Sequence, residues 1–318
     1  MQIIDQPGAY TIPEADYHAD PCAVPSLSRS VAHTLVYQSP LHAWYQHPRL
    51  NPQHEHESSE RFDLGSAAHA LLLGGTAAGI CVVDADDWRT KAAKAARDEA
   101  RNNGLTPILR KHDYAVRKMV DAAREAIEHS PYAGCLDSAS GASGQTLVWR
   151  NGDSWCRCLL DRITAGNSLI LDYKTTESAA PSPWSRGHMV QHGYDMQCEF
   201  YKQGAEAVFG TRPSFIFIVQ EIHRPYAVSF VTLCESFHDV ARGKIELALA
   251  QWRRCMKSNQ WPGYHGFIAE PPPWELTEHE MRMAEVASMS APVATDDDAA
   301  ADLFGAAGGR DANLLNKA

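Results

Sequence analysis

The chain is organised around the stretch WCRCLLDRITAGNSLILDYK, residues 155–174. Two apolar runs flank the polar segment 164–168, which is the pattern of a β-hairpin. Asp161 lies near the end of the first run, Asp172 lies in the second, and Lys174 follows two residues later. Alternate residues of a strand point to the same face, so the hairpin predicts that Asp172 and Lys174 emerge side by side, with Asp161 across from them.

These charges indicate a candidate catalytic site. Two carboxylates and an ammonium at the end of a sheet are costly to bury together unless a cation intervenes. Such an arrangement can hold a divalent metal ion and a phosphate. The alternative is that the charges only keep the end of a strand soluble, and the hairpin by itself leaves both interpretations open.

Length, composition and charge narrow the class of protein. The 318 residues, 44% of them hydrophobic, can bury a sizeable core in one large domain or two. No run of about 18 apolar residues occurs and the first ten residues lack the pattern of a signal peptide, so we expect a cytoplasmic protein without a membrane span. The net charge of −10 argues against a broad basic surface for nucleic acid. It still permits a local basic groove, or a site whose metals supply the positive charge.

Cysteine usage indicates a reducing compartment. The cysteines are scattered and none forms a C-x-x-C pair, so neither a zinc ribbon nor a disulfide framework is indicated. Cys156 and Cys158 alternate on one expected strand and fit best as buried apolar residues. The eight cysteines are Cys22, Cys81, Cys135, Cys156, Cys158, Cys198, Cys234 and Cys255.

The N-terminal part is expected to be mainly helical after a polar start. Residues 1–25 are interrupted by prolines and predict an extended lead-in. Ser26 or Ser28 can cap a helix that runs to Tyr37. A second, short helix is expected over residues 42–46, before Pro48 stops it.

One histidine of the next region lies in an unusual setting. The loop 51–61 carries histidines and acids, but no flanking structure fixes their geometry, so a solvated loop is favoured over a metal site. Residues 62–73 (FDLGSAAHALLL) then predict a tightly packed buried helix with His69 in its middle. A lone histidine in an apolar helix is usually a satisfied core residue, and a metal ligand is the alternative.

The second half of the chain alternates strands and helices. Helices, three antiparallel strands, a helix, two strands and a helix predict an α/β fold with a central mixed sheet flanked by helices and a helical N-terminal part. The Ala- and Asp-rich composition of residues 269–318 predicts a disordered tail, which leaves 26–268 as the folded domain. We expect strands at 80–83, 145–150, 214–221 and 227–233, and helices at 87–102, 111–129, 188–209 and 235–259.

The central hairpin resembles the core of the PD-(D/E)XK nucleases, which is restriction-endonuclease-like. In that family an acid on one strand and a (D/E)-x-K motif on the next bind metal and position the attacking water. The matching residues here are Asp161 and, ten residues further on, the run Asp172-Tyr173-Lys174. This motif is short and frequent by chance. The residues around it are more specific, and they indicate which branch of the family the chain resembles.

Those surroundings are similar to the exodeoxyribonuclease VIII (RecE)-like exonucleases of phages and prophages. The similarity spans most of residues 10–268, in the order of that family. One departure is Gln145, because the family often has an acid in this region and an amide cannot supply an anionic ligand. The similar motifs are the S-x-S … S-P-x-H run of residues 28–42, GSAAHALL at 65–72, RCLLD at 157–161, DYKTT at 172–176 and WPGY at 261–264.

The resemblance implies a role for each matching residue. Asp161, Asp172 and His69 would bind Mg²⁺ or Mn²⁺ and take part in catalysis. The backbone carbonyl of Tyr173 would complete the metal shell. Lys174 would orient the attacking water and offset the charge that develops in the transition state. The implied contacts to DNA are Gln197, Tyr201, Arg157 and Thr175.

The activity implied is a Mg²⁺-dependent exodeoxyribonuclease. It would degrade double-stranded DNA from its ends, 5′ to 3′, in phage-type recombination. The implied partners are duplex DNA ends, a RecT-like single-strand annealing protein and further copies of the chain in a ring.

Two other classes remain as alternatives. The first is a catalytically silent DNA-binding or scaffold protein on the same fold, which has no physical reason to keep an unpaired charged cluster. The second is an Fe–S-containing CRISPR- or RecB-type nuclease. Its cluster needs four cysteines, and only Cys22 and Cys255 lie near suitable positions.

Overall fold

The computed structural model describes residues 2–54, 60–74 and 79–290. The chain divides into two units, residues 1–264 and residues 265–318. Part of the predicted loop 51–61 and the tail from residue 291 lie outside the described residues.

A mixed seven-stranded sheet forms the centre of the first unit as the structure describes it. Its order is β1-β5-β6-β7-β8-β9, and the short strand β2 pairs in parallel with β6. β5, β6 and β7 are antiparallel neighbours, β7 and β8 are parallel, and β8 and β9 are antiparallel. The predicted α/β class is therefore confirmed. The strands are β1 (Gly8–Tyr10), β2 (Leu27–Ser28), β5 (Gly141–Asn151), β6 (Ser154–Thr164), β7 (Leu169–Thr176), β8 (Ser214–Glu221) and β9 (Val228–Val231).

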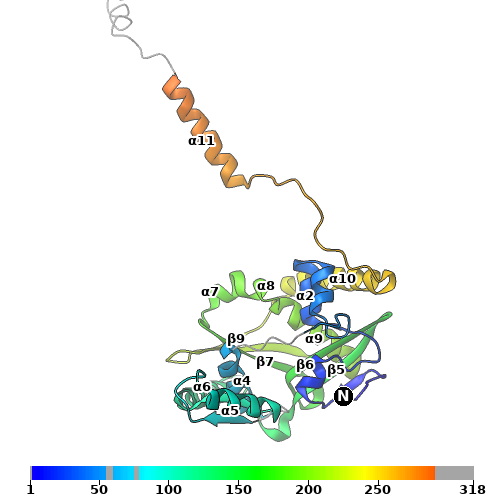
Figure 1. Cartoon of the computed structure of the whole chain (residues 1–318), viewed down its shortest axis with the longest axis vertical. Coiled ribbons are helices and arrows are strands. Elements are labelled where there is room, and N and C mark those ends of the chain that lie inside the picture. The colour runs from blue at the N-terminus through cyan, green and yellow to red at the C-terminus, as the bar shows by residue number, and fades with distance from the viewer. Residues whose placement is uncertain (1, 55–59, 75–78, 291–318) are drawn as a thin grey trace, which may run out of the picture. The chain divides into compact units, whose positions relative to one another are not determined.

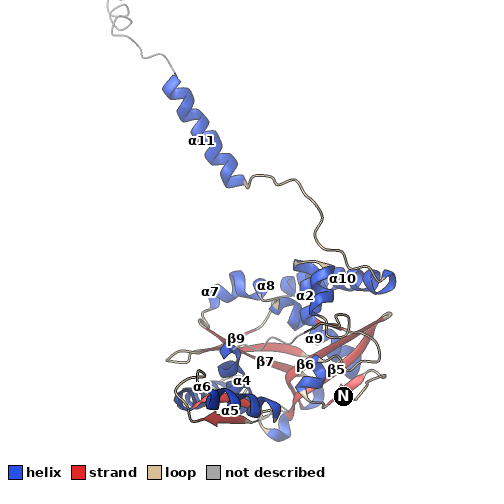
Figure 2. Ribbon diagram, in the orientation of Figure 1, coloured by secondary structure: helices blue, strands red, loops and turns tan. Residues whose placement is uncertain are grey.

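Helices cover both faces of this sheet (Figure 1 and Figure 2). One face packs on α2, α3, α9 and α10 in a core that includes Phe200, Phe217 and Trp252. The other face packs on α4 and α6, next to a two-stranded parallel sheet of β3 (Ile80–Val83) and β4 (Thr106–Leu109). The helices of this unit are α1 (Glu14–His18), α2 (Arg29–Tyr37), α3 (Pro40–Gln46), α4 (Glu60–Leu73), α5 (Lys91–Asn102), α6 (Arg110–Glu128), α7 (Pro181–Pro183), α8 (Met189–Gln191), α9 (Tyr194–Phe209) and α10 (Glu235–Ser258).

The predicted hairpin is confirmed. β6 and β7 are joined by a short turn over Ala165–Asn167. Gly166 and Asn167 have φ of 76° and 56°, in the left-handed region that glycine and asparagine tolerate better than other residues. The local sequence therefore determines where the chain reverses.

The predicted helix 188–209 and the region around β4 differ from the structure. The expected helix 188–209 is interrupted, since a π-helical turn at Trp184–His188 and α8 precede α9, and Gly193 between them has φ of 64°. The side chain of His33 occupies the space where a Cβ of Gly193 would lie, so only glycine fits this junction. The strand β4 was not predicted, and it contains Pro107, a residue that is disfavoured inside strands.

Residues 1–25, predicted to be an extended lead-in, are instead part of the fold. They contribute β1 and α1, and β1 pairs with β5 at the edge of the sheet. Ile4, Ile12 and Tyr17 pack with Val148 and Trp155 in a separate small core.

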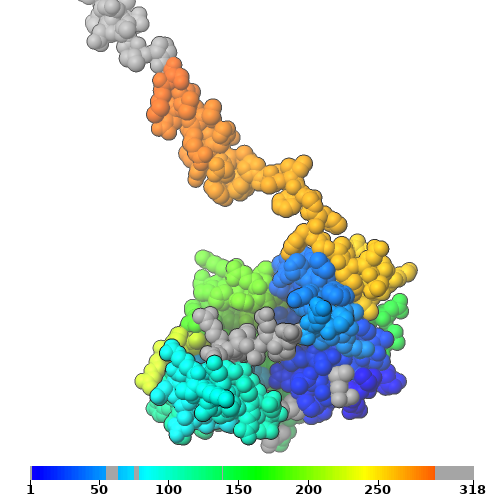
Figure 3. Space-filling view, in the orientation of Figure 1, coloured from blue at the N-terminus to red at the C-terminus, as the bar shows by residue number. Residues whose placement is uncertain are grey.

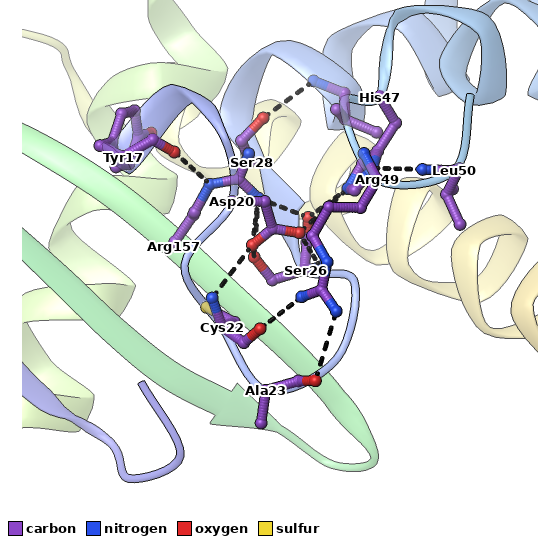
Figure 4. A network of polar contacts seen from close by, with 11 residues as sticks. Tyr17, Asp20, Cys22, Ala23, Ser26, Ser28, His47, Arg49, Leu50 and Arg157 are labelled. Atoms are coloured by element: carbon purple, nitrogen blue, oxygen red, sulfur yellow. Dashed lines mark hydrogen bonds and ion pairs between the residues drawn. The ribbon is translucent and has the colours of Figure 1, made fainter. Parts of the chain in front are cut away.

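A buried ionic network ties this segment to β6 (Figure 4). Asp20 accepts hydrogen bonds from the N–H and hydroxyl of Ser26, at 2.9 and 2.7 Å. It also forms ion pairs with Arg157 at 3.1 Å and with His47 at 3.4 Å. Arg157 further donates to the carbonyl of Tyr17 and is 3% exposed. Arg157 was predicted to contact DNA, but the structure places it in this network, where its guanidinium is engaged by protein groups.

Removing the carboxylate of this network should destabilise the protein. Asp20→Asn is expected to lower the free energy of unfolding at pH 7 by roughly 3 kcal/mol, because Arg157 becomes a buried charge without its anion. The measurement is urea denaturation, with the exposed Asp5→Asn as the matched control.

The effect of Asp20→Asn should depend on pH. Burial raises the pKa of Asp20, but the hydrogen bonds and charges of His47, Arg157 and Ser26 outweigh it and lower the pKa below its ordinary value of 3.8. The stabilisation is therefore present above that value and is lost as the pH falls through the lower folded-state pKa. The difference from wild type should narrow below about pH 4, and a difference that stays constant with pH would contradict this account.

In the second unit the described part is mainly one helix, α11 (Pro273–Ser290). A disordered tail was predicted here, and the structure has a helix that buries none of its residues. Its exposed apolar side chains include Trp274, Met281 and Met289. Across the described residues, no helix is both long enough and apolar enough to span a membrane.

Candidate active site

The candidate site forms where β6 and β7 separate. The ladder between these strands ends at the pair Arg162–Leu171. The next residues beyond that pair are Asp161 on β6 and Asp172 on β7. The backbone N–H of Tyr173, released from the ladder, donates to Asp161 Oδ2 at 2.8 Å. This hydrogen bond holds the acid of one strand against the backbone of the other.

Three further side chains converge on the two acids. Nε2 of His69 on α4 lies 3.1 Å from Asp161 Oδ1. The ammonium of Lys174 forms an ion pair with Asp172, and the amide nitrogen of Gln197 on α9 donates to the other oxygen of that carboxylate. Lys174 and Asp172 therefore emerge side by side, as the alternation of the strand predicts. Helices from both faces of the sheet therefore contribute to this site. We call the point where β6 and β7 separate, with Asp161, Asp172, Lys174, His69 and Gln197, the fork.

The side chains of the site differ in their exposure to solvent. The side chains of Asp161, Lys174 and His69 keep 16%, 19% and 31% of their surface exposed, whereas Asp172 keeps 1%. A ligand would thus reach Asp161, Lys174 and His69 first, with Asp172 forming the floor.

The electrostatics of the two acids differ. Burial and the charge of Asp161 raise the pKa of Asp172 to about 6. Burial also acts on Asp161, but the charge and hydrogen bond of His69, together with Lys174, outweigh it and lower the pKa of Asp161. The carboxylates in turn raise the pKa values of His69 and Lys174 despite burial. The negative charge of Asp172 is therefore the less well compensated of the two.

This geometry can be compared with known proteins. A family model described as a PDDEXK-like domain of unknown function (DUF3799) matches residues 39–269. The chain belongs to this family. The match includes all the residues of the fork, and it establishes the predicted fold class, a PD-(D/E)XK core.

One solved structure is similar to the chain at the level of the fold. The "Putative exonuclease" of Eubacterium rectale superposes with a TM-score of 0.52 at 13% identity, over 85% of this chain and 94% of that chain. The protein SSO0001 covers 70% of this chain and 77% of its own at 13% identity, and its TM-score of 0.28 is too low to bear on the fold. No curated protein sequence matches the chain.

The GSAAHALL motif explains how α4 of this PDDEXK-like domain brings His69 to the acids. A Cβ on Gly65 would lie 2.8 Å from the hydroxyl of Thr175, so glycine lets α4 approach β7 closely. Ala67 and Ala68 are fully buried against the same side of the sheet. His69 follows one turn after Gly65 on the same side of the helix. The small residues therefore set the distance between the imidazole and Asp161.

The other predicted site residues lie at different distances from the fork. Thr175 faces Gly65 of α4, on the side of β7 opposite to Lys174. Tyr201 is buried in the core below α9, where burial raises the pKa of its phenol. The phenol of Tyr173 donates to Gln220 within the other core, so only its backbone belongs to the site. The structure thus brings Gln197 to the acids, whereas Tyr201 is part of the buried core, with its ring against Phe215.

Two residues near the site were not predicted. The ring of Tyr194 lies 5.5 Å from the Lys174 ammonium and stacks on Trp184. It shares the helix face of Gln197, and that spacing is the signal that could have identified it. Glu14 is the second: a hydrogen bond with His18 lowers its pKa, and the charges of His69 and Asp161 also act on it. Nothing in the local sequence marks Glu14, because its place depends on how the N-terminal segment packs.

The donor groups of the fork fit a hard divalent cation. Among the described residues, no three His, Cys, Asp or Glu side chains are grouped so as to hold a metal as they stand. Carboxylate oxygens with one imidazole are nevertheless ligands that Mg²⁺ and Mn²⁺ accept. Gln197 Oε1 is buried and accepts no hydrogen bond from the described residues, whereas Asp172 Oδ1 is the oxygen paired with Lys174. A cation near Asp172 would add positive charge to a carboxylate whose pKa is raised by burial and by Asp161.

The close packing of α4 on β7 can be tested by enlarging Gly65. Gly65→Val is expected to lower the free energy of unfolding by about 2 kcal/mol, because the added methyl groups overlap the Thr175 side chain. Ser66→Val, the neighbouring exposed position on the same helix, is the control and should change it by less than about 0.5 kcal/mol. The measurement is urea denaturation, and equal losses in both variants would show that the contact does not matter.

Proposed function

We propose that this PDDEXK-like protein is a metal-dependent DNA exonuclease. The observation that carries the proposal is the fork of β6 and β7, where Asp161, Asp172 and Lys174 meet His69 at a partly exposed edge of the sheet. Membership of the PDDEXK-like family and the fold shared with a protein named as an exonuclease support it.

Asp161, Asp172 and His69 would hold Mg²⁺ or Mn²⁺, with the Tyr173 carbonyl as a further ligand. When bound, such an ion supplies Lewis acidity toward a phosphate and toward water. The raised pKa of Asp172 supports a cation site, since a carboxylate that is poorly compensated gains most from added positive charge.

The protein's own groups would orient the reaction. Lys174 carries a positive charge at neutral pH, because the two carboxylates raise its pKa, and it would hold water and stabilise developing negative charge. Tyr194 lies against this ammonium and would restrict its position. Gln197 fixes the carboxylate of Asp172 from α9.

The finer points of the proposal come from the RecE-like motifs. We propose digestion of duplex DNA from its ends, 5′ to 3′, within phage-type recombination in the cytoplasm. The partners would be DNA ends, a RecT-like single-strand annealing protein and further copies of the chain in a ring. Each of these extends the central proposal and is separately testable.

The deciding experiment compares two forms of one plasmid. End-labelled linear duplex should be degraded in Mg²⁺ or Mn²⁺ and be intact in EDTA, while the covalently closed circle should survive throughout. Cleavage of the circle at the same rate would show that the protein is an endonuclease and not an exonuclease. No cleavage with either metal would favour a silent DNA-binding protein on this fold.

Asp172→Asn should separate chemistry from folding. The amide has the same size as the carboxylate but cannot supply an anionic ligand, so cleavage should fall at least a hundredfold, on the order seen when one positioned electrostatic contact is lost. The control is Asp153→Asn, the same change at the exposed turn of the β5–β6 hairpin. Activity within tenfold of wild type would place the metal elsewhere.

Without metal, Asp172→Asn should not destabilise the protein, in contrast to its expected loss of cleavage. Because the folded-state pKa of Asp172 is raised to about 6, ionisation of this group opposes folding as the pH rises from its ordinary value of 3.8 through 6. The variant should therefore melt at the same temperature as wild type or higher at pH 8 in EDTA. It should also lose the rise in melting temperature that Mg²⁺ gives wild type.

His69→Ala distinguishes a ligand from a core residue. A ligand role predicts little loss of metal-free stability and a loss of cleavage of a hundredfold or more. A purely structural role predicts a loss of about 1 to 3 kcal/mol with cleavage by the folded protein largely retained. Paired melting and cleavage measurements decide between the two, and a destabilised but active variant would remove His69 from the proposed site.

A further inference from the structure

A second groove lies beside α4, where the first turns of α5 and α6 come together. Its volume is about 660 Å³, and it lies between these helix starts and β4. Figure 3 shows the surface of α5 and α6 exposed in cyan. We call this the α5–α6 groove. The lining residues that matter here are Leu64, Trp88, Arg89, Lys94, Ile108 and Lys111.

The groove has more basic than acidic side chains, although the protein has a net charge of −10: Arg89, Lys94 and Lys111 line it together with one acid, Asp87. Arg89 pairs with Asp87 at 3.6 Å, the acid that also lines the groove. Within the described residues, Lys94 and Lys111 form no ion pair or hydrogen bond, so their charges face the groove uncompensated. An anionic ligand would supply the missing charge.

The helix starts add to this positive potential. The first turn of α5 contains no acid, and the acid in the first turn of α6, Asp113, is paired with Arg117 at 2.9 Å. Helix N-termini carry partial positive charge, so lysines near them are unfavourable unless an anion binds. Lys94 and Lys111 both lie within one turn of such a start.

The remaining lining is apolar and aromatic. Trp88 is half-buried at the groove, and Leu64 and Ile108 lie beside it. A volume of this order encloses a ligand of small-molecule size, which corresponds to one or two nucleotides and not to a duplex. Lysines with a nearby aromatic ring are the combination that binds an unpaired strand, since only unpaired bases expose a face for stacking.

The groove and the fork share one helix, α4. Leu64 precedes His69 by five residues, which is about 7.5 Å along the helix axis and about 140° around it, so the two side chains lie on different faces of α4. Gly65, next to Leu64, packs against Thr175 directly after Lys174. When one strand of a duplex end is removed nucleotide by nucleotide, the other strand becomes unpaired near the site, and a strand that continues along α4 would come to the groove.

We propose that the α5–α6 groove binds an unpaired DNA strand beside the active site. Lys94 and Lys111 contact its phosphates and Trp88 stacks on one of its bases. The identity of the ligand as DNA rests on the proposed function, whereas binding itself requires no cleavage.

The test measures binding without chemistry. Fluorescein-labelled (dT)20 is titrated in EDTA against protein that carries Asp172→Asn. The added pair Lys94→Ala and Lys111→Ala should weaken binding at least tenfold and reduce the slope of log K against log salt by about 1.4, the value for two lost phosphate contacts. Trp88→Ala should weaken binding about tenfold.

The control pair is Lys118→Ala with Lys257→Ala, which makes the same charge change outside the groove and should alter affinity less than twofold. If an alanine pair fails to fold, the pair Lys94→Gln and Lys111→Gln replaces it. Equal weakening by the control pair would overturn the proposal. Tighter groove-dependent binding of (U)20 or of duplex DNA would also overturn it, because it would indicate an RNA or a duplex site. Full competition by dTMP would overturn it as well, because it would indicate a mononucleotide site.

A small substrate separates this proposal from the proposed function. Hydrolysis of bis(4-nitrophenyl) phosphate by Lys94→Ala/Lys111→Ala in the wild-type background should be unchanged, because this ester reaches the fork without using the groove. Loss of that hydrolysis would show that the lysines act on the fork itself. Binding of (dT)20 that depends on the groove in a protein that cleaves nothing would support the groove and reject the exonuclease.

Discussion

The hydrogen bond from the Tyr173 backbone to Asp161 organises this molecule. It forms at the point where the β6–β7 ladder stops, and it replaces a strand pairing with a contact to a carboxylate. Because the two strands separate there, helices from both faces of the sheet can reach the same pair of acids. α4 supplies His69 and α9 supplies Gln197. An unbroken ladder would keep those two faces apart, and the acids could not be approached from both.

The hairpin and its charges could be predicted from the sequence, because the information is local. Alternating apolar residues and a turn with Gly166 and Asn167 define β6 and β7, and the period of the strand places Asp172 beside Lys174. The role of His69 could not be decided in this way. Its helix is apolar and looks like core, and only the close approach allowed by Gly65 brings the imidazole to Asp161.

The N-terminal segment shows why other parts were not predictable. Its polar, proline-interrupted sequence predicts a lead-in, yet Asp20 anchors it through Arg157 and His47, which lie far away in the chain. Such a network has no period and no fixed spacing, so no local pattern reveals it. For the same reason Arg157, which lies on β6 four residues before Asp161, is a structural anchor, and Glu14 reaches the vicinity of His69 only in the folded protein.

Charge balance links the fork to its environment. Two acids are held against two groups of the protein that are themselves cationic or become so, and the pKa shifts show that the balance is incomplete at Asp172. A divalent cation would complete it, but it would also compete with Lys174 for the same carboxylate. In the proposed metal-bound protein, the ring of Tyr194 would keep the Lys174 ammonium near the fork if the Asp172 carboxylate bound the metal ion instead. On the proposed metal site, the residues around the acids would thus hold a divalent ion while keeping the Lys174 ammonium nearby.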